Sequence, residues 1–335
     1  IPEEISKKLR ASYYFMGALL GKYKHVEMYF PGGCSIGQRP INLHLKGFEA
    51  LGATVTNDGN KYIVDAKELK GSNIYLDIAS VGATINIMLA AVRAKGKTTI
   101  DNAAKEPEIV NVATFLNNMG AKISGAGTSE IIIEGVDSLK GCFHEVIPDR
   151  IEAGTYTIIG ALVGNYLKID NIIPEHIEAL TSKLMEMGVE LEIGSDYLIV
   201  NKSENPKAVN IKTLVYPGFP TDLQQPFTVL LTRCKGKSSV IETIWENRFM
   251  HIPELNKLGA NITVEGMEAK VLGPTPLVGT EVEATDLRAG AAMVAAALAA
   301  EGTTTITNIN HILRGYENIV EKLTDVGAKI ELKEI

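Results

Sequence analysis

A glycine-rich loop, PGGCSIGQRP, places a cysteine in surroundings that favour reactivity. Cys34 lies between Gly33 and Gly37, and glycine permits backbone conformations in which several N–H groups point at one ligand. A nearby cation such as Arg39 lowers the pKa of a thiol and so favours the nucleophilic thiolate. A buried structural cysteine in a tight turn explains the same residues equally well. The loop alone therefore leaves a reactive thiol and a structural one as alternatives.

Six of the eight arginines follow a regular pattern, although lysines are far more numerous in the chain. The first set begins apolar helical segments and comprises Arg10, Arg150 and Arg288. The second set lies in loops before amphipathic segments and comprises Arg39, Arg248 and Arg314. Helix N-termini already attract anions, and arginine adds bidentate recognition of phosphate or carboxylate. We therefore expect anion-binding ends that would form a cationic cleft if two of them faced each other. Salt bridges at helix caps are the simpler alternative.

Asp222 is the strongest candidate for a general base. It lies in FPTDLQQ, where Pro220 and Thr221 precede an apolar helical segment. A carboxylate at such a position commonly caps the helix, which is the alternative role. If it faces an anion-binding end instead, it would accept a proton from a hydroxyl group. Asp286 occupies the corresponding place in TDLRAG, and His44, shortly after the cysteine loop, is the histidine that we expect at the same site.

These residues recur at related places because the chain is built from five repeats. Each repeat has an amphipathic segment that ends at a glycine and is followed by an alternating strand pattern. The shared glycines are Gly52, Gly120, Gly188, Gly259 and Gly327, at intervals of 68, 68, 71 and 68 residues. Upstream lies a helix that is apolar on nearly all sides, such as VGATINIMLAAV, and then another strand. We predict the order helix, strand, helix, strand, strand, with strands wrapped around buried helices.

Five repeats predict two domains that meet near Pro148. A fresh repeat begins at DRIEAGT, so residues 148–335 would hold three repeats and residues 1–147 would hold two. An even, three-plus-three arrangement would need one more repeat before Ile1. We therefore expect about one N-terminal repeat to be missing, and a chain that truly begins at Ile1 to be poorly folded or inactive.

Composition excludes several classes of protein. The chain has 335 residues, a net charge of −7 and no apolar run long enough to cross a bilayer, so neither a membrane protein nor an extended nucleic-acid-binding surface is predicted. Three widely spaced cysteines, Cys34, Cys142 and Cys234, argue against a disulfide framework and for a reducing compartment, the cytoplasm. The six histidines have no spacing typical of a metal site.

The order of motifs along the whole chain resembles the UDP-N-acetylglucosamine 1-carboxyvinyltransferases, in particular the type of Gram-positive bacteria. The motifs are PGGCSIGQRPINLH, SVGATINIMLAAV, AAKEPEIVNVATFLNNMGAKI, PDRIEAGTY, FPTDLQQPF, ENRFMHIPEL, ATDLRAGA and HILRGYENI. The resemblance implies an α/β fold of two inside-out, barrel-like domains, each of three helix-strand-helix-strand-strand units. It implies transfer of the enolpyruvyl group of phosphoenolpyruvate to the 3-hydroxyl of UDP-N-acetylglucosamine, the first committed step of peptidoglycan synthesis. Both partners are small molecules, no metal or cofactor is implied, and we expect a monomer or weak oligomer.

The resemblance also implies residue roles. Cys34, on a lid loop of the first domain, would act as general acid toward phosphoenolpyruvate, bond to it and react with fosfomycin. Asp222 would bind the sugar and deprotonate its 3-hydroxyl. The implied substrate-binding residues are Arg10, Arg39, Pro40, Ile41, Asn42 and Leu43, Ser80, Val81 and Gly82 near the diphosphate, Ile244 at the sugar, and Arg288 and Arg314 at phosphoenolpyruvate. To these we add His44, Arg248 and Asp286 from the patterns above.

Departures from the family pattern and three rival functions remain. Ile78 stands where many relatives have lysine, Asn42 stands where they have aspartate, and the family's N-terminal Lys-Asn pair has no counterpart. The shikimate-pathway synthase shares the fold but not the cysteine loop or RPINLH. A non-catalytic paralogue would bind the UDP-sugar without turnover. An RNA-phosphate cyclase would need a histidine nucleophile motif that is absent from the sequence.

Overall fold

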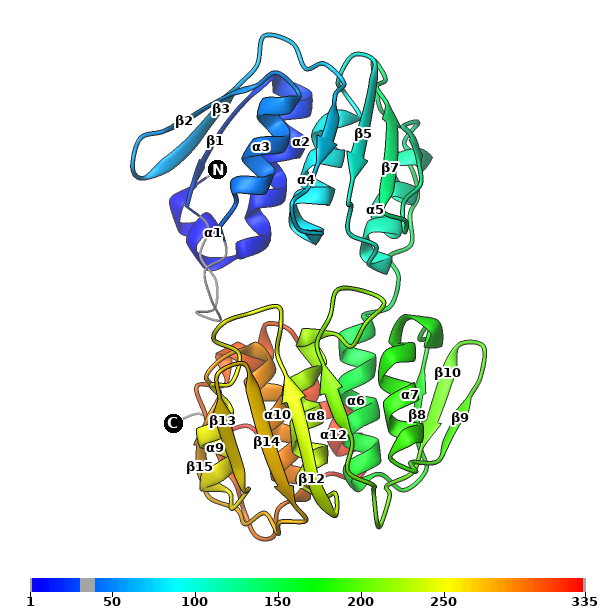
Figure 1. The fold of residues 1–335 in the computed structure, drawn as a ribbon, viewed down its shortest axis with the longest axis vertical. Helices are drawn as coiled ribbons and strands as arrows, with labels where there is room; N and C mark the ends of the chain where they lie inside the picture. The colour runs from blue at the N-terminus through cyan, green and yellow to red at the C-terminus, as the bar shows by residue number, and fades with distance from the viewer. Residues whose placement is uncertain (1, 31–39, 334–335) are drawn as a thin grey trace. The chain divides into compact units, whose positions relative to one another are not determined.

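A computed structural model of the chain describes residues 2–30 and 40–333. They form two compact units, one ending at Ile147 and the other beginning at Pro148 (Figure 1). Each unit has its own hydrophobic core, which runs from Met16 to Ile133 in the first unit and from Ile151 to Leu323 in the second. Among the described residues, no helix combines the length and the apolar character needed to cross a membrane.

The first unit contains two repeats. Its elements are α1 Glu3–Lys8, η1 Arg10–Tyr13, α2 Tyr14–Tyr23, β1 His25–Tyr29, α3 Asn42–Ala50, β2 Thr54–Asn57, β3 Lys61–Asp65, β4 Asn73–Tyr75, α4 Val81–Ala91, β5 Lys97–Asp101, α5 Pro107–Asn118, β6 Lys122–Ser124 and β7 Glu130–Glu134. They build two sheets, in the orders β1-β3-β2 and β4-β5-β7-β6.

The second unit contains three repeats. Its elements are α6 Arg150–Val163, β8 Leu167–Asp170, η2 Pro174–Ile177, α7 Glu178–Glu186, β9 Leu191–Ile193, β10 Tyr197–Val200, β11 Asn210–Lys212, α8 Thr221–Leu231, β12 Gly236–Ile241, α9 Ile252–Lys257, β13 Ile262–Glu265, β14 Glu268–Gly273, β15 Glu281–Glu283, α10 Leu287–Ala299, β16 Thr305–Thr307, α11 Asn310–Leu313 and α12 Ile319–Asp325. The sheets are β8-β10-β9, β11-β12-β14-β13 and β15-β16.

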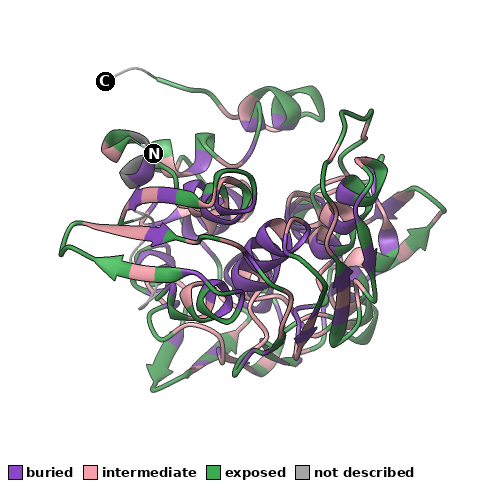
Figure 2. Ribbon diagram, turned by 90° about the horizontal axis from the view of Figure 1, so that it is seen from above, coloured by how far each residue is buried: buried purple, intermediate pink, exposed green. Residues whose placement is uncertain are grey.

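The helices that are apolar on all sides lie inside each unit, which confirms the predicted inside-out architecture. In α8 every residue from Leu223 to Leu231 is buried, and the same holds for α10 from Ala289 to Ala296. Helices α6, α8 and α10 pack against one another (Figure 1). Buried residues gather on such helices, whereas the tips of the hairpins are exposed (Figure 2). In the first unit α2 packs on α4, where a Cβ added to Gly17 would lie 2.1 Å from the Asn86 carbonyl oxygen.

The five repeat glycines share one backbone conformation, which explains why glycine recurs at this position. Each follows an amphipathic helix and has a positive φ between 85° and 103°, a conformation that costs glycine little. The residue after the glycine closes the cap: the N–H of Ala121, for example, donates to the Leu116 carbonyl oxygen. The glycine thus turns the chain from each helix into the following segment.

A short strand that the sequence pattern did not reveal links successive repeats. β4, β11 and β15 each pair in parallel with the first strand of the next repeat, β5, β12 and β16. Each is only three residues long, too short for an alternating pattern to be recognised. These parallel pairs hold one repeat against the next.

The fifth repeat departs from the predicted order. The sequence predicts a strand after Gly327, but residues 328–333 have no regular secondary structure. In the other repeats this strand pairs with a hairpin partner, as β6 pairs with β7. Within residues 2–30 and 40–333 the fifth repeat has no such partner, and an isolated strand is not stable.

Candidate functional site

The first turn of α8 carries a carboxylate held between two arginines. Asp222 lies one residue after the start of α8, whose N-cap is Pro220. Its Oδ1 accepts a hydrogen bond from Arg248 Nη2 at 2.5 Å, and its Oδ2 lies 3.4 Å from Arg288 Nη2. The carboxylate thus faces the arginines, which favours the site role of Asp222 over a helix-capping role.

The charges around Asp222 keep it ionised. Burial raises the pKa of this carboxyl, but Arg288 and Arg248, with a smaller contribution from Arg150, hold the pKa well below its usual value. A carboxylate in this state is available to accept a proton at any physiological pH. It is also a weak base, because both arginines stabilise the charged form. Strong base catalysis therefore requires that Asp222 give up part of its arginine contact.

Two glutamines fix the loop that carries Arg248. The side-chain amides of Gln224 and Gln225 both donate to the Arg248 carbonyl oxygen, at 3.0 and 3.2 Å. Gln225 Nε2 also lies 3.4 Å from Asp286 Oδ2. Asp286 Oδ1 accepts from two backbone N–H groups and so caps α10 just before Arg288. One buried network therefore ties together α8, the Arg248 loop and the start of α10.

Glu242 is a buried residue that sequence reasoning missed, and it is bonded to the residue before Asp222. Its Oε1 accepts from the N–H of Ile244 and the hydroxyl of Thr213, both at 2.8 Å. Its Oε2 accepts from Thr221 Oγ1, also at 2.8 Å, directly before Asp222. One carboxylate thus holds both the backbone of Ile244, the predicted sugar contact, and the side chain of the residue before the predicted base. A signal existed in the sequence: at the end of β12 the chain reads IET, where three other repeats have IDN or ITN at the corresponding strand end.

In the first unit, the starts of three helical segments come together. Arg10 begins η1, His44 lies in the first turn of α3, and Ser80–Gly82 begin α4, with Ser80 as the N-cap. The rings of Tyr13 and His44 are 4.8 Å apart, and the Arg10 guanidinium carbon lies 5.5 Å from the centre of the Tyr13 ring. A Cβ on Gly82 would lie 2.6 Å from the Tyr13 hydroxyl and 3.0 Å from His44 Cε1, so the close approach requires glycine.

Asn86, a polar residue inside the apolar α4, sets the hydrogen bonding of His44. Its Oδ1 accepts from the Gly17 N–H at 2.6 Å, which fixes the amide orientation. Its Nδ2 donates to the Tyr13 carbonyl oxygen at 2.9 Å and lies 3.0 Å from His44 Nδ1. Because Nδ2 can only donate, Nδ1 accepts, and neutral His44 carries its proton on Nε2. His44 is therefore a fixed donor beside the N-terminus of α4.

We expect His44 to titrate far below neutral pH. Burial, with the positive charge of Arg10, lowers the pKa of His44 to about 4. An unfolded chain would protonate this ring below about 6.5. Stability contributed by neutral His44 is therefore lost as the pH falls from that value toward the folded pKa. An NMR titration should place the His44 midpoint near pH 4, with the resonance identified by its absence in His44→Gln. A midpoint near 6.5 would contradict the buried, neutral ring.

The structure locates some of the remaining predicted site residues in the fold and does not describe the others. Cys34 and Arg39 lie outside the described residues. Pro40 is exposed, Ile41 is the buried N-cap of α3, and Asn42 and Leu43 follow in the first turn of that helix. Arg314 is exposed at the C-cap of α11.

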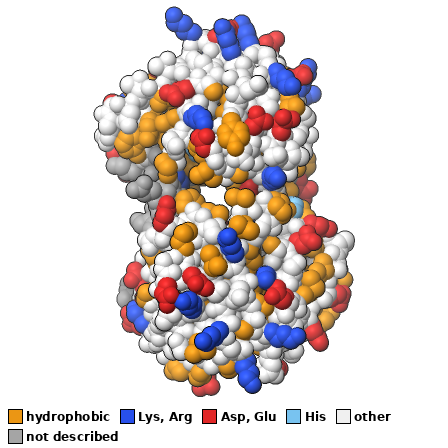
Figure 3. Space-filling model, in the orientation of Figure 1, with side chains coloured by type: hydrophobic (Ala, Val, Ile, Leu, Met, Phe, Trp, Pro, Cys, Tyr) orange, Lys and Arg blue, Asp and Glu red, His pale blue; other side chains and the backbone are white. Residues whose placement is uncertain are grey.

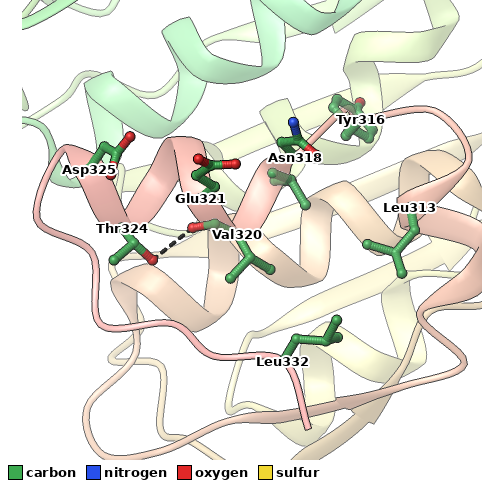
Figure 4. A pocket seen from close by; sticks show the side chains of 9 residues that line it. Leu313, Tyr316, Asn318, Val320, Glu321, Thr324, Asp325 and Leu332 are labelled. Carbon is green, nitrogen blue, oxygen red and sulfur yellow. Dashed lines mark hydrogen bonds between the residues drawn. The ribbon is translucent and has the colours of Figure 1, made fainter. Parts of the chain in front are cut away.

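Shape and surface charge alone do not locate these clusters. A groove of about 500 Å³ lies beside α12, where Leu313, Val320 and Leu332 face it (Figure 4), and none of the predicted site residues lines it. On the face drawn in Figure 3, acidic and basic side chains are interspersed. Within the described ranges no group of three or more His, Cys, Asp or Glu residues is placed to hold a metal ion.

Relatives of known sequence share nearly the whole chain. A family model described as EPSP synthase (3-phosphoshikimate 1-carboxyvinyltransferase) matches residues 1–323. A Geobacillus kaustophilus protein named UDP-N-acetylglucosamine 1-carboxyvinyltransferase 2 is 60% identical over 330 residues, 98% of this chain and 77% of its own length. A Shouchella clausii protein of the same name is 58% identical over 335 residues, 100% of this chain and 78% of its own length.

Solved structures share the fold. The enolpyruvyl transferase NikO from Streptomyces tendae is 27% identical, with a TM-score of 0.90 over 98% of this chain and 79% of its own. An EPSP synthase from Acinetobacter baumannii is 18% identical, with a TM-score of 0.74 over 97% of this chain and 78% of its own. Because the family model and the close relatives agree over almost the full sequence, the chain belongs to the EPSP synthase family and, within it, to the UDP-N-acetylglucosamine 1-carboxyvinyltransferases.

Proposed function

We propose that this chain transfers the enolpyruvyl group of phosphoenolpyruvate to the 3-hydroxyl of UDP-N-acetylglucosamine, with release of phosphate, in peptidoglycan precursor synthesis. The observation that carries the proposal is identity of 58–60% to relatives named for this transfer. The A. baumannii EPSP synthase structure, at 18% identity, supports the fold alone. The arginine-held carboxylate in the second unit adds chemical support.

The second unit would carry the general base and most of the arginines that bind phosphoenolpyruvate. The sugar hydroxyl adds to C2 of phosphoenolpyruvate while C3 gains a proton, and phosphate then leaves as C3 loses a proton. Asp222 would accept the hydroxyl proton, and Ile244 would contact the sugar through its backbone. Arg248, Arg288 and Arg314 would bind the carboxylate and phosphate charges, as fixed cations stabilise charge in a transition state. Asp286 would act indirectly, by fixing the start of α10.

The first unit would bind the nucleotide part. The N-terminus of α4, with Ser80, Val81 and Gly82, offers N–H groups suited to a diphosphate. Arg10 and the Nε2–H of His44 add donors beside it. Residues 39–43 would hold the uridine, with the uracil near Pro40. In this proposal protein side chains supply all the charges, without metal or cofactor.

Cys34 would act as the general acid and as the target of fosfomycin. We place the enzyme in the cytoplasm, where a free thiol stays reduced, as a monomer or weak oligomer. Its product would serve cell-wall synthesis and thereby cell shape and division.

The test is phosphate release from phosphoenolpyruvate with and without UDP-N-acetylglucosamine. We expect release that depends on the UDP-sugar, is abolished by fosfomycin, and is lost in Cys34→Ala. Fosfomycin should leave no adduct on Cys34→Ala by intact-mass analysis. Release driven by shikimate 3-phosphate instead would favour the rival synthase. Binding of the UDP-sugar without release would favour a non-catalytic paralogue.

A further inference from the structure

The guanidinium of Arg288 contacts a different partner at each of its two ends, at unequal distances. Its Nη1 donates to the Tyr316 hydroxyl at 3.0 Å, and its central carbon lies 5.5 Å from the centre of the Tyr316 ring. Its Nη2 lies 3.4 Å from Asp222 Oδ2. Charge-assisted hydrogen bonds usually span about 2.7–2.9 Å. The hydrogen bond to Tyr316 is thus the shorter of the two contacts, and the ion pair with Asp222 is longer than usual.

Chemistry fixes the direction of the hydrogen bonds behind Arg288. Arginine can only donate, so the Tyr316 oxygen accepts from Nη1. The Tyr316 proton then points to Thr155 Oγ1 at 3.0 Å, and the Thr155 proton points to the Ile151 carbonyl oxygen at 2.8 Å. Tyr316 and Thr155 are each 1% exposed, so water does not compete for these bonds. The chain runs from α10 through the turn after α11 to α6.

The repeats single out Tyr316 in a second, independent way. The residue eleven positions before the repeat glycine is a buried isoleucine in three repeats: Ile41, Ile109 and Ile177. In the fourth and fifth repeats it is Arg248 and Tyr316, which are buried as well. These two polar exceptions each contact one member of the Asp222–Arg288 pair. Burying a polar group in place of isoleucine is costly unless it is hydrogen-bonded. At both positions the polar side chain is therefore better explained by its contact with the Asp222–Arg288 pair than by core packing.

We propose that Tyr316 is a positioning residue that anchors Nη1 of Arg288, so that Nη2 is the end that passes from Asp222 to the anionic substrate. The inference rests on the proposed function, in which that anion is phosphoenolpyruvate. When the anion takes Nη2, Asp222 Oδ2 loses a cation and becomes free to accept the hydroxyl proton of the sugar. Binding of one substrate thereby strengthens the base that activates the other.

Tyr316→Phe tests this with the removal of one oxygen atom. The ring and its packing remain, but Nη1 loses its acceptor, and Arg288 is no longer held for the anion. We expect KM for phosphoenolpyruvate to rise by about 10- to 100-fold, the range for a lost hydrogen bond to a charged group. KM for UDP-N-acetylglucosamine should stay unchanged.

Tyr156→Phe is the matched control. It removes the same atom from a neighbouring tyrosine whose hydroxyl is buried and, in the part of the chain that the structure describes, has no hydrogen-bond partner. We expect wild-type KM values for both substrates. Thr155→Val removes the acceptor of the Tyr316 proton and should raise KM for phosphoenolpyruvate less than Tyr316→Phe does. The double variant should match Tyr316→Phe, because both changes break one chain.

Two outcomes would overturn the inference. One is equal KM values for phosphoenolpyruvate in Tyr316→Phe and Tyr156→Phe. The other is an equal rise in KM for both substrates with a lowered Tm, which would indicate a purely structural role. If the wild-type protein releases no phosphate, the proposed function fails separately. In that case the rise in Tm caused by phosphoenolpyruvate still measures how strongly Arg288 binds this anion. The rise should be smaller in Tyr316→Phe than in Tyr156→Phe.

Discussion

Replacing Asp222 by asparagine is expected to lower kcat by about 10²- to 10⁴-fold, the usual contribution of a general base. Asparagine keeps the size of the side chain and an acceptor oxygen for Arg248, but it cannot take the hydroxyl proton. The low pKa of Asp222 gives a further expectation. Because this carboxyl stays ionised as the pH falls from 7 to 5, any loss of kcat/KM in that range must come from other groups.

The control for this substitution is Glu246→Gln, which neutralises an exposed acid two residues before Arg248. It changes the net charge equally and should retain wild-type kcat. Circular dichroism and Tm would establish that Asp222→Asn is folded. A folded Asp222→Asn variant with kcat within fivefold of the wild type would show that another group is the base.

Replacing Arg248 by alanine is expected to impair both stability and turnover. The side chain of Arg248 is only 3% exposed, whereas that of its partner Asp222 is 37% exposed. Breaking a buried ion pair costs about 3–5 kcal/mol. We expect about 3 kcal/mol here, since water screens part of the carboxylate charge left behind. Loss of a fixed cation at the reacting groups should lower kcat by about 10²- to 10³-fold.

Urea unfolding followed by tryptophan fluorescence measures this loss of stability near Arg248. Trp245 is the one tryptophan of the chain and lies three residues before Arg248. Arg233→Ala, at an exposed position just after α8, is the matched control and should leave the urea midpoint unchanged. If both variants unfold at the same midpoint, the Arg248–Asp222 pair does not stabilise the second unit.

Much of the fold follows from the sequence because its signals are local. Helix periodicity, the apolar character of the central helices and the repeat glycines each depend on neighbouring residues and on backbone conformation. The same repeats placed Arg150 and Arg288 at the beginnings of α6 and α10. The short linking strands escaped notice because three residues carry too little pattern. The strand predicted after Gly327 failed because its existence depends on a partner rather than on its own residues.

The site depends on contacts between distant residues, and sequence predicts these only partly. Glu242 and Tyr316 give no motif of their own. They become visible once the repeats are aligned, as polar or acidic departures from a shared position. Asn86 is signalled only as a polar residue inside an apolar helix. What each of these side chains bonds to was decided by packing between elements.

The two TDL segments show where the sequence stops being informative. By sequence, Asp222 and Asp286 occupy corresponding places, and for Asp222, the predicted base, a capping role was the alternative. In the structure Asp286 caps α10, whereas α8 begins one residue before Asp222 and the carboxylate turns to Arg248 and Arg288. Their threonines differ as well: Thr221 Oγ1 donates to Glu242, while Thr285 Oγ1 has no hydrogen-bond partner among the described residues.

The sequence by itself determined the repeat and the buried helices, because these depend on local periodicity, and the order of its motifs indicated the family and the residue types available for catalysis. Only the tertiary structure decided which carboxylate is paired with arginines and which one caps a helix. The physical reason is that a carboxylate's role is set by the charges and N–H groups within a few ångströms of it. For Asp222 those groups come from residues 26 and 66 positions away in the chain.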